Sequence, residues 1–282
     1  MKEFTLIREV RGELDKAVDN GKSVGFVPTM GALHEGHLEL IRRSVRENDI
    51  TVCSIFVNPI QFNNHEDLEK YPRNLLLDEK MLLSQGCDIL FAPSVEEMYP
   101  STEKEIFDID FGYLERILEG KFRPGHFRGI AIVVKKLFDI VRPEKVYFGK
   151  KDYQQLMIIK ELVFRLKIPV EVVACETVRE PDGLAMSSRN LRLTIGERKV
   201  AARIYEILKQ AKERSSSQSI LKIKKWALKN LQENPDFRVE YLEIVDNRTL
   251  LPVTKWNNRQ NALVCIAVWL GNVRLIDNLE LF

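Results

Sequence analysis

The chain has 282 residues, of which 45% are hydrophobic and 30% are charged, and its formal net charge is +2. This composition excludes an intrinsically disordered chain and is typical of a globular protein with a buried core. Because positive and negative charges nearly balance, neither nucleic acid nor a membrane surface is expected as the main partner. At roughly 150 residues per domain, the length predicts about two domains.

The chain carries no sign of export or membrane insertion. Its first residues, MKEFTLIREVRGELDKA, are amphipathic and too charged for a secretory signal. The apolar run ALVCIAVWL falls short of the roughly 20 residues that span a bilayer, and it is typical of a buried strand. Cys53, Cys87, Cys175 and Cys265 form no CxxC pair and are predicted to be buried free thiols. We therefore expect a cytoplasmic protein in a reducing compartment.

Helices and strands alternate in the first part of the chain. Strands are predicted at residues 24–27, 50–57, 88–92, 106–111, 145–148 and 170–178. Helices are predicted at residues 3–20, 35–48, a segment ending near 85, 130–141 and 150–166. Pro28 is expected to end the first strand, and Val45 is expected to face the core from its helix. Residues 120–129, GKFRPGHFRG, are predicted to be a loop.

This alternation predicts an α/β fold with a doubly wound parallel sheet. Ligands bind such sheets beyond the carboxyl ends of the strands. Residues 28–37, 58–61 and 149–152 all follow predicted strands. The candidate site is therefore expected at this edge of the sheet.

The pattern changes after residue 178. Helices are predicted at 195–214 and 220–231, and strands at 237–245, 262–270 and 273–281. Gly271-Asn272 is expected to form a two-residue hairpin turn between the last two strands. We predict a first domain at residues 1–177, followed by a smaller α+β domain at 178–282.

His34 and His37 lie three residues apart where a predicted helix begins. This spacing places both imidazoles on one side of the first turn. The N–H groups of that turn favour phosphate, and imidazole can donate to phosphate oxygens or stabilise a leaving pyrophosphate. Two ordinary surface histidines are an alternative. A zinc site is a further alternative, but the sequence offers no evident third ligand nearby.

Two other segments carry groups suited to a nucleotide. One is the run Met186, Ser187, Ser188 and Arg189, whose two hydroxyls and guanidinium can bind a triphosphate. Alternatively, this run forms an ordinary polar turn in which a serine caps the following helix. The other is GKKD at 149–152, where the glycine lets a ligand approach the backbone, a lysine can neutralise phosphate charge and the aspartate can accept from ribose hydroxyls. Alternatively, this segment is a solvated charged turn. Since neither GxGxxG nor GxxxxGK[ST] occurs, no glycine-rich cradle is expected.

The carboxamides of Asn58, Gln61 and Gln155 can each donate and accept a hydrogen bond. They suit a small substrate with a hydroxyl and a carboxylate, or they satisfy loop backbone. Arg123, His126 and Arg128 are candidate anion binders or simply exposed charges. Asp78, near a predicted helix start, is a candidate magnesium ligand or a helix-capping acid.

Six ordered segments together resemble the pantothenate synthetase (pantoate–β-alanine ligase) family of the nucleotidyltransferase superfamily. They are VPTMGALHEGHL at 27–38, IFVNPIQF at 55–62, YPRN at 71–74, RPGHFRGIAIVVKKLF at 123–138, VYFGKKDYQQL at 146–156 and DGLAMSSRN at 182–190. The resemblance implies a Rossmann-like first domain with a HIGH-like signature at 34–37 and a KMSKS-like one at 186–189. Asn63-Asn64-His65, where the family often has glycine, and Pro181 are departures in loops.

The resemblance also implies a two-step reaction. The carboxylate of pantoate attacks the α-phosphate of Mg-ATP, which gives an enzyme-bound pantoyl adenylate and pyrophosphate. The amine of β-alanine then attacks the acyl carbon and releases pantothenate, a coenzyme A precursor, and AMP. The implied partners are pantoate, β-alanine, ATP with Mg²⁺, and a second copy of the chain in a homodimer.

The resemblance assigns roles to the candidate residues. The implied ATP contacts are Met30, Gly31, Ala32, Leu33, His34, Glu35, Gly36, His37, Gly149, Lys150, Lys151, Asp152, Val178, Met186, Ser187, Ser188 and Arg189. His37 is the implied proton donor, with His34 and Lys151 also at the phosphates. Gln61 would bind pantoate and β-alanine, and Gln155 would bind pantoate. Asn58 and His126 are also predicted to bind the substrate.

Water must be excluded because acyl adenylates hydrolyse readily, so we expect the second domain to close as a lid that includes residues 186–189. One alternative is a nucleotidyltransferase that transfers AMP or CMP to a phosphorylated substrate, but NPIQF and KKDYQQL would not then be expected together. Another is a nucleotide-sensing module without catalysis. The intact histidine pair and Ser-Ser-Arg segment argue against it.

Overall fold

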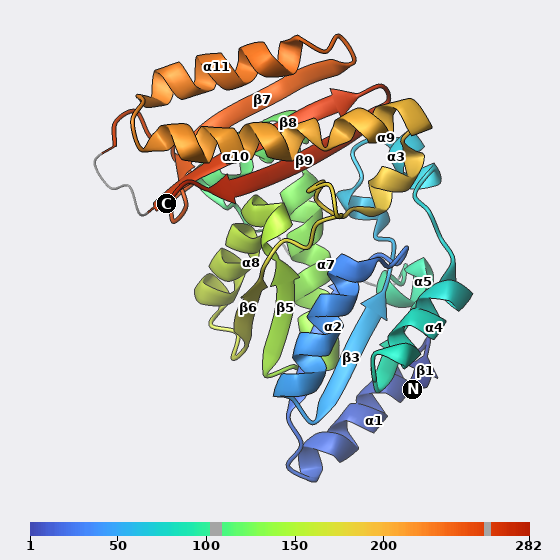
Figure 1. Cartoon of the computed structure of the whole chain (residues 1–282). Coiled ribbons are helices and arrows are strands. Elements are labelled where there is room, and N and C mark those ends of the chain that lie inside the picture. The colour runs from blue at the N-terminus through green and yellow to red at the C-terminus, as the bar shows by residue number, and fades with distance from the viewer. Residues whose placement is uncertain (102–108, 257–260) are drawn as a thin grey trace. The chain divides into compact units, whose positions relative to one another are not determined.

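The computed structural model in Figure 1 describes residues 1–101, 109–256 and 261–282. The chain forms two compact units. The first comprises Met1–Lys150 with Gln155–Glu176, and the second comprises Lys151–Gln154 with Thr177–Phe282.

The first unit is built on a six-stranded parallel sheet with the order β1-β4-β3-β2-β5-β6. Its strands are β1 (Lys2–Phe4), β2 (Val24–Thr29), β3 (Ile50–Ile55), β4 (Ile89–Phe91), β5 (Lys145–Gly149) and β6 (Glu171–Cys175). From β2 the chain moves outward to β3 and β4, whereas β5 lies on the other side of β2 and leads to β6. The predicted doubly wound parallel sheet is confirmed.

Helices cover both faces of this sheet. The helices that start in this part of the chain are α1 (Ile7–Asp19), α2 (Glu35–Glu47), α3 (His65–Glu69), α4 (Leu75–Ser84), α5 (Val95–Met98), α6 (Leu118–Phe122), α7 (His126–Val141) and α8 (Tyr153–Leu166). Helix α2 packs on β2, β3 and β5 and contacts α4, whereas α7 packs on β2 and contacts α1. In Figure 1, α2 lies in front of the sheet and α7 lies behind it.

Strand β2 continues through Pro28, contrary to the prediction. The carbonyl of Val24 faces β5, because it accepts from the N–H of Glu144, and that of Thr29 faces β3, because it accepts from the N–H of Phe56. By alternation, the nitrogen of Pro28 faces β5, where strand pairing has already ended at Phe26. The missing N–H therefore costs no ladder hydrogen bond.

Other predictions of local structure need correction. Residues 2–4 form a strand that pairs with β4, so the first helix is shorter than predicted. Most of residues 120–129 are helical, since α6 ends at Phe122 and α7 begins at His126. Val45 is 38% exposed. Part of the strand predicted at 106–111 lies outside the described residues, and residues 109–111 form no strand.

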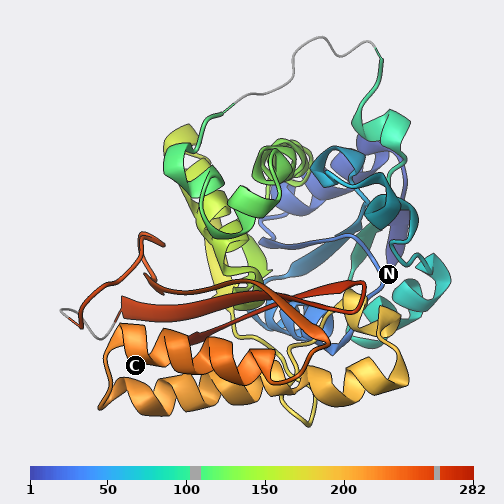
Figure 2. The same cartoon turned by 90° about the horizontal axis from the view of Figure 1, so that it is seen from above.

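The second unit pairs a sheet with a layer of helices. Its elements are α9 (Ile195–Ala201), α10 (Arg203–Ser215), α11 (Ile220–Gln232), β7 (Phe237–Asp246), β8 (Ala262–Leu270) and β9 (Val273–Glu280). The sheet is antiparallel with the order β7-β8-β9, and Gly271-Asn272 forms the predicted turn between β8 and β9. Figure 2 shows α10 and α11 side by side along this sheet.

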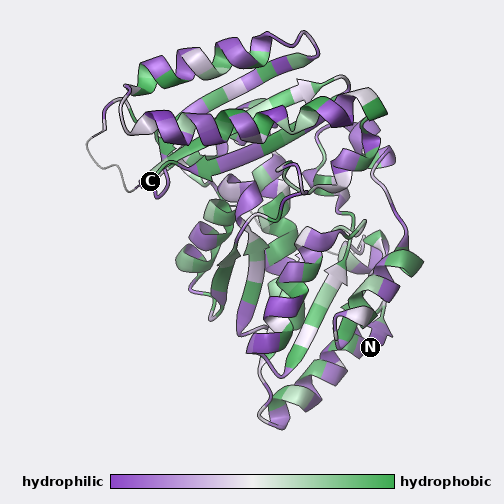
Figure 3. Cartoon of the chain, viewed as in Figure 1, coloured by the Kyte–Doolittle hydropathy of each residue, from purple (hydrophilic) through white to green (hydrophobic). Residues whose placement is uncertain are grey.

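Amphipathic helices close the core of the second unit. Ile207 on α10 and Ile223 on α11 are fully buried in one cluster with Val264 and Ile266 of β8. Hydrophilic and hydrophobic bands alternate along both helices in Figure 3, as expected of helices with one buried face.

All four cysteines of the chain are free and buried, as predicted. Their exposed fractions range from 0 to 6%. Within the described residues, no helix has both the length and the apolar character needed to cross a bilayer.

Candidate active site

The candidate site begins where two neighbouring strands of the first unit end. Strands β2 and β5 pair in parallel, and β2 is the point from which the chain turns to opposite edges of the sheet. Met30 directly follows β2, and Lys150 directly follows β5. In doubly wound sheets this topological switch point is where ligands bind.

The turn after β2 has an unusual backbone that Asp78 holds in place. Gly31 and Ala32 both have left-handed conformations, with φ of 78° and 49°. The Asp78 Oδ2 atom accepts from the Ala32 N–H at 2.9 Å, and Oδ1 accepts from the Leu33 N–H at 2.7 Å. A Cβ atom on Gly31 would lie only 2.9 Å from Asp78 Oδ2. The carboxylate thus fixes the first half of the predicted ATP segment.

Asp78 is only 1% exposed. Burial raises the pKa of its carboxyl, and the two backbone N–H bonds partly oppose this effect. Asp78 does not cap α4, because Asn74 does so by accepting from the Leu77 N–H. No group of three or more His, Cys, Asp or Glu among the described residues could hold a metal ion. The geometry favours a positioning role for Asp78, and its predicted magnesium role stays a prediction.

His34 and His37 lie together where α2 begins. His34 is the N-cap, and its Nδ1 atom accepts from the Gly36 N–H at 3.1 Å. The Nδ1 atom of His37 accepts from the His34 N–H at 3.3 Å, and the two ring centroids are 4.0 Å apart. Because each Nδ1 is an acceptor, each neutral ring carries its proton on Nε2. The predicted closeness of the rings is confirmed, and both are in the tautomer that can donate through Nε2.

Asn58 is 1% exposed and directly precedes the η1 turn (Pro59–Gln61). Its side chain connects this turn with Tyr99, which follows α5, and with Gly129 on α7. Its Oδ1 atom accepts from the Tyr99 hydroxyl at 2.9 Å and from the Ile60 N–H at 3.3 Å. Its Nδ2 atom donates to Gln61 Oε1 at 3.2 Å and to the Gly129 carbonyl at 3.1 Å. The alternative in which these amides satisfy loop backbone is realised at Asn58 by its bond from the Ile60 N–H, and its predicted role in binding substrate stays a prediction.

Gln61 is brought to the ATP segment by these contacts. Its Nε2 atom donates to Met30 Sδ at 3.0 Å. The buried His126 holds its backbone, because His126 Nδ1 lies 2.9 Å from the Gln61 carbonyl oxygen and must donate to it. Helix α7 approaches so closely that a Cβ on Gly129 would lie 2.6 Å from Gln61 Cα. Met30, Asn58, Gln61 and His126 thus form one connected group.

The remaining candidates of the first unit lie in more open positions. A Cβ on Gly149 would meet no protein atom within 4 Å, so there is space for a ligand to approach the backbone there. Lys150 pairs with Glu176, and Gln155 is half-buried on α8. Arg128 is exposed. Arg123 forms an ion pair with Glu119, with 3.9 Å between Nη1 and Oε2.

In the second unit, a strand holds the backbone of Lys151. The Asn278 Nδ2 atom on β9 donates to the Lys151 carbonyl at 2.8 Å. The neighbouring Asp277 is 4% exposed and accepts two bonds from Arg179, at 2.7 and 2.9 Å. Burial raises the pKa of Asp277, and the Arg179 guanidinium opposes this rise. Asp152 Oδ2 lies 3.9 Å from Lys151 Nζ.

The predicted adenine and phosphate segments of the second unit are also joined. The Met186 N–H donates to the Val178 carbonyl at 3.0 Å. Ser187 caps the short helix η4 (Ser188–Arg192) by accepting from the Arg189 N–H at 3.3 Å. The alternative of a serine cap is thus realised by Ser187, while Ser188 is buried at 7% exposure.

Tyr99, Gly129 and Asn278 did not emerge from sequence reasoning. Each acts on a candidate residue far away in the chain, and no local motif marks such a contact. The nearest signal was Gly129, which lies inside the RPGHFRG segment.

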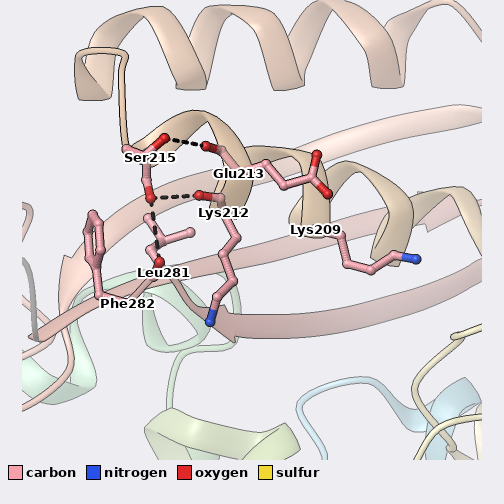
Figure 4. A pocket seen from close by; sticks show the side chains of 7 residues that line it. Lys209, Lys212, Glu213, Ser215, Leu281 and Phe282 are labelled. Carbon is pink, nitrogen blue, oxygen red and sulfur yellow. Dashed lines mark hydrogen bonds between the residues drawn. The ribbon is translucent and has the colours of Figure 1, made fainter.

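A hollow of about 420 Å³ beside α10 contains none of the predicted site residues. Figure 4 shows Lys209, Lys212 and Phe282 around it. The Ser215 hydroxyl there donates to the Lys212 carbonyl. We assign no ligand to this hollow.

Comparison with known proteins identifies close relatives. The family model described as Pantoate-beta-alanine ligase matches residues 2–280. The pantothenate synthetase of Azobacteroides pseudotrichonymphae genomovar. CFP2 is 49% identical over 272 residues, covering 96% of each chain. That of Bacteroides fragilis (strain ATCC 25285) is 46% identical over 280 residues, covering 99% of each chain.

Solved structures share the fold. Pantothenate synthetase from Thermus thermophilus matches with a TM-score of 0.94 and 44% identity over 100% of both chains. Pantoate-beta-alanine ligase from Francisella tularensis, complexed with beta-gamma ATP and beta-alanine, matches with a TM-score of 0.83 and 37% identity. The match covers 100% of this chain and 98% of that one.

Proposed function

The chain belongs to the pantoate–β-alanine ligase family, and we propose that it condenses pantoate with β-alanine, consuming ATP and releasing AMP and pyrophosphate. The observation that carries the proposal is the histidine pair after β2, in which both neutral rings bear their proton on Nε2. It is supported by a ligase of the same family bound to an ATP compound and β-alanine.

In the first step, a carboxylate oxygen of pantoate bonds to the α-phosphorus of ATP, and the bond from that phosphorus to pyrophosphate breaks. His34 and His37 donate through Nε2 to phosphate oxygens, and His37 supplies a proton to the leaving pyrophosphate. Lys151 adds positive charge at the phosphates. These groups stabilise charge that builds up as pyrophosphate leaves.

In the second step, the amine of β-alanine attacks the acyl carbon of the adenylate. The C–N bond forms, the bond to AMP breaks, and the amine loses a proton. Gln61 contacts both pantoate and β-alanine, and Gln155 contacts pantoate. Asn58 and His126 lie behind Gln61 and support it through its side chain and backbone.

ATP contacts several segments of the chain in this proposal. Residues 30–37 and 149–152 contact the phosphates and ribose, and Val178 contacts adenine through its backbone. Met186, Ser187, Ser188 and Arg189 complete the ATP contacts. We also propose that the domain at residues 178–282 acts as a lid over the domain at 1–177, because the adenylate must be kept from water.

Magnesium enters with ATP in this proposal. When bound, Mg²⁺ neutralises phosphate charge and polarises the α-phosphate. The donor set of the chain fits an ion carried by phosphates, because the described residues contain no cluster of three protein ligands. Asp78 is the predicted ligand from the chain, although both of its oxygens also accept backbone N–H groups.

We propose that the protein acts in the cytoplasm as a homodimer. The four buried free cysteines suit a reducing compartment. Light scattering after size-exclusion chromatography tests the assembly, and a monomer mass would contradict the dimer.

An isotope-exchange experiment tests the adenylate mechanism. With pantoate and Mg-ATP but no β-alanine, labelled pyrophosphate should exchange into ATP. Omitting pantoate should abolish the exchange. If pantoate elicits no exchange while pantothenate still forms, the adenylate step is wrong. Tight ATP binding without any turnover would instead favour a nucleotide sensor.

A further inference from the structure

The hydrogen-bond polarity of the Asn58 amide is set by two backbone groups. The Ile60 N–H can only donate, so the atom of Asn58 that faces it must be Oδ1. The Gly129 carbonyl can only accept, so the atom that faces it must be Nδ2. The two contacts agree, and together they exclude the flipped amide.

This orientation determines that of Gln61 in turn. Because Asn58 Nδ2 is a donor, the Gln61 atom 3.2 Å from it must be the acceptor Oε1. Gln61 Nε2 therefore points the other way, toward Met30 Sδ. A thioether sulfur is a weak acceptor, so a substrate oxygen can replace it at little cost.

Tyr99 completes the chain of bonds from a distant element. It is the residue directly after α5, and its hydroxyl donates to Asn58 Oδ1 at 2.9 Å. Its ring lies against Phe56, with 6.0 Å between the ring centroids, and Lys136 Nζ lies 5.4 Å from the centroid of its ring. These contacts keep the hydroxyl directed at Asn58.

We propose that Tyr99, acting through Asn58, is a positioning residue that holds the Nε2–H groups of Gln61 toward the substrate. The amide then presents hydrogen-bond donors, which select an oxygen acceptor of pantoate and disfavour a donor-only group at that point. Asn58 serves the substrate indirectly, because both donors and both lone pairs of its amide are used within the protein. The inference rests on the proposed function, in which Gln61 binds pantoate.

The first test replaces the tyrosine hydroxyl. Tyr99→Phe should raise the KM for pantoate in ATP–pyrophosphate exchange by about 3- to 10-fold, the loss expected from one neutral hydrogen bond. The KM for ATP and kcat should change less than about twofold. Tyr147→Phe is the matched control, because the Tyr147 hydroxyl also forms hydrogen bonds within the protein, with the side chains of Glu47 and Asn48. It should lower the melting temperature similarly without changing the KM for pantoate.

The second test shows whether Tyr99 acts through Gln61. In a Gln61→Ala background, Tyr99→Phe should change kcat/KM for pantoate by less than about twofold, because the amide that it positions is gone. An unchanged KM in the single variant, or an undiminished effect in the double variant, would overturn the proposal. Failure of the proposed function is distinguishable, because the unmodified protein would then show no pantoate-dependent exchange.

Discussion

The Nδ1 atoms of His34 and His37 each accept from a backbone N–H, so the proton of each neutral ring is on Nε2. The helix start therefore selects the tautomer as well as the place of both rings. Asp78 acts one step further back, because its carboxylate accepts from the N–H groups of Ala32 and Leu33 in the left-handed turn that precedes the histidines. At the scale of single residues, backbone N–H groups organise the chemistry as much as side chains do.

Replacing His37 with alanine should lower kcat for ATP–pyrophosphate exchange by about 10²- to 10³-fold, because a donor to developing charge is lost. Circular dichroism should show an unchanged fold. His65→Ala is the control, since that side chain is 82% exposed. Full activity in His37→Ala would remove this residue from the catalytic role.

Replacing Asp78 with asparagine should reduce the free energy of unfolding by about 1–3 kcal/mol, because one buried backbone N–H then faces an amide NH₂ group. The KM for ATP should rise as the turn at Gly31 and Ala32 loosens. Urea unfolding and exchange kinetics measure the two effects. Asp49→Asn is the control, because exposed Asp49 also accepts a backbone N–H, from Ser23. Equal behaviour of the two variants would count against the positioning role.

Helix α7 and the η1 turn meet at a point where only glycine fits. The Cβ of any other residue at 129 would lie 2.6 Å from Gln61 Cα and 2.7 Å from the Ile60 carbonyl oxygen. These are backbone atoms, which cannot move aside as a flexible side chain can. At the scale of elements, the position of Gln61 therefore depends on how closely α7 approaches.

Gly129→Ala should destabilise the protein by about 1–3 kcal/mol through overpacking and raise the KM for pantoate by displacing Gln61. Gly12→Ala is the matched control in another helix, where a Cβ meets no atom within 4 Å. That change should stabilise by about 0.5–1 kcal/mol. A pantoate KM equal to that of the unmodified protein in Gly129→Ala would show that the approach of α7 does not govern Gln61.

The two units can be observed separately, because the three tryptophans, Trp226, Trp256 and Trp269, all lie in the second. Their fluorescence reports that unit, whereas circular dichroism reports the whole chain. At the scale of the molecule, this difference tests whether ATP contacts the second unit as proposed.

ATP at about 100 times its Kd should stabilise the folded protein by about 2.7 kcal/mol. The urea concentration at the midpoint of unfolding, followed by tryptophan fluorescence, should therefore rise. Arg189→Ala should remove at least half of that shift, because a phosphate contact in the second unit is lost. Arg203→Ala, on α10, should keep it. A shift seen by circular dichroism alone would contradict ATP contacts in the second unit.

The main architecture is predictable from the sequence because alternating helix and strand patterns are local. The turn at Gly271-Asn272 is predictable too, since a two-residue turn is specified by adjacent residues. The end of β2 is not predictable from Pro28, because the cost of proline in a strand depends on whether the neighbouring strand is paired there. The Gly, Arg and His residues at 120–129 are typical of a loop, whereas in the structure Gly125 caps α7.

The fold class, the order of the motifs and the residue types available for nucleotide chemistry follow from local spacing, so they can be predicted from the chain alone. What orients those residues depends on contacts that form only in the folded protein. Asn58 meets Tyr99 across 41 positions and Gly129 across 71, and Asp78 meets Leu33 across 45. Hydrogen-bond polarity and left-handed turns depend on such distant partners, and no local pattern encodes them.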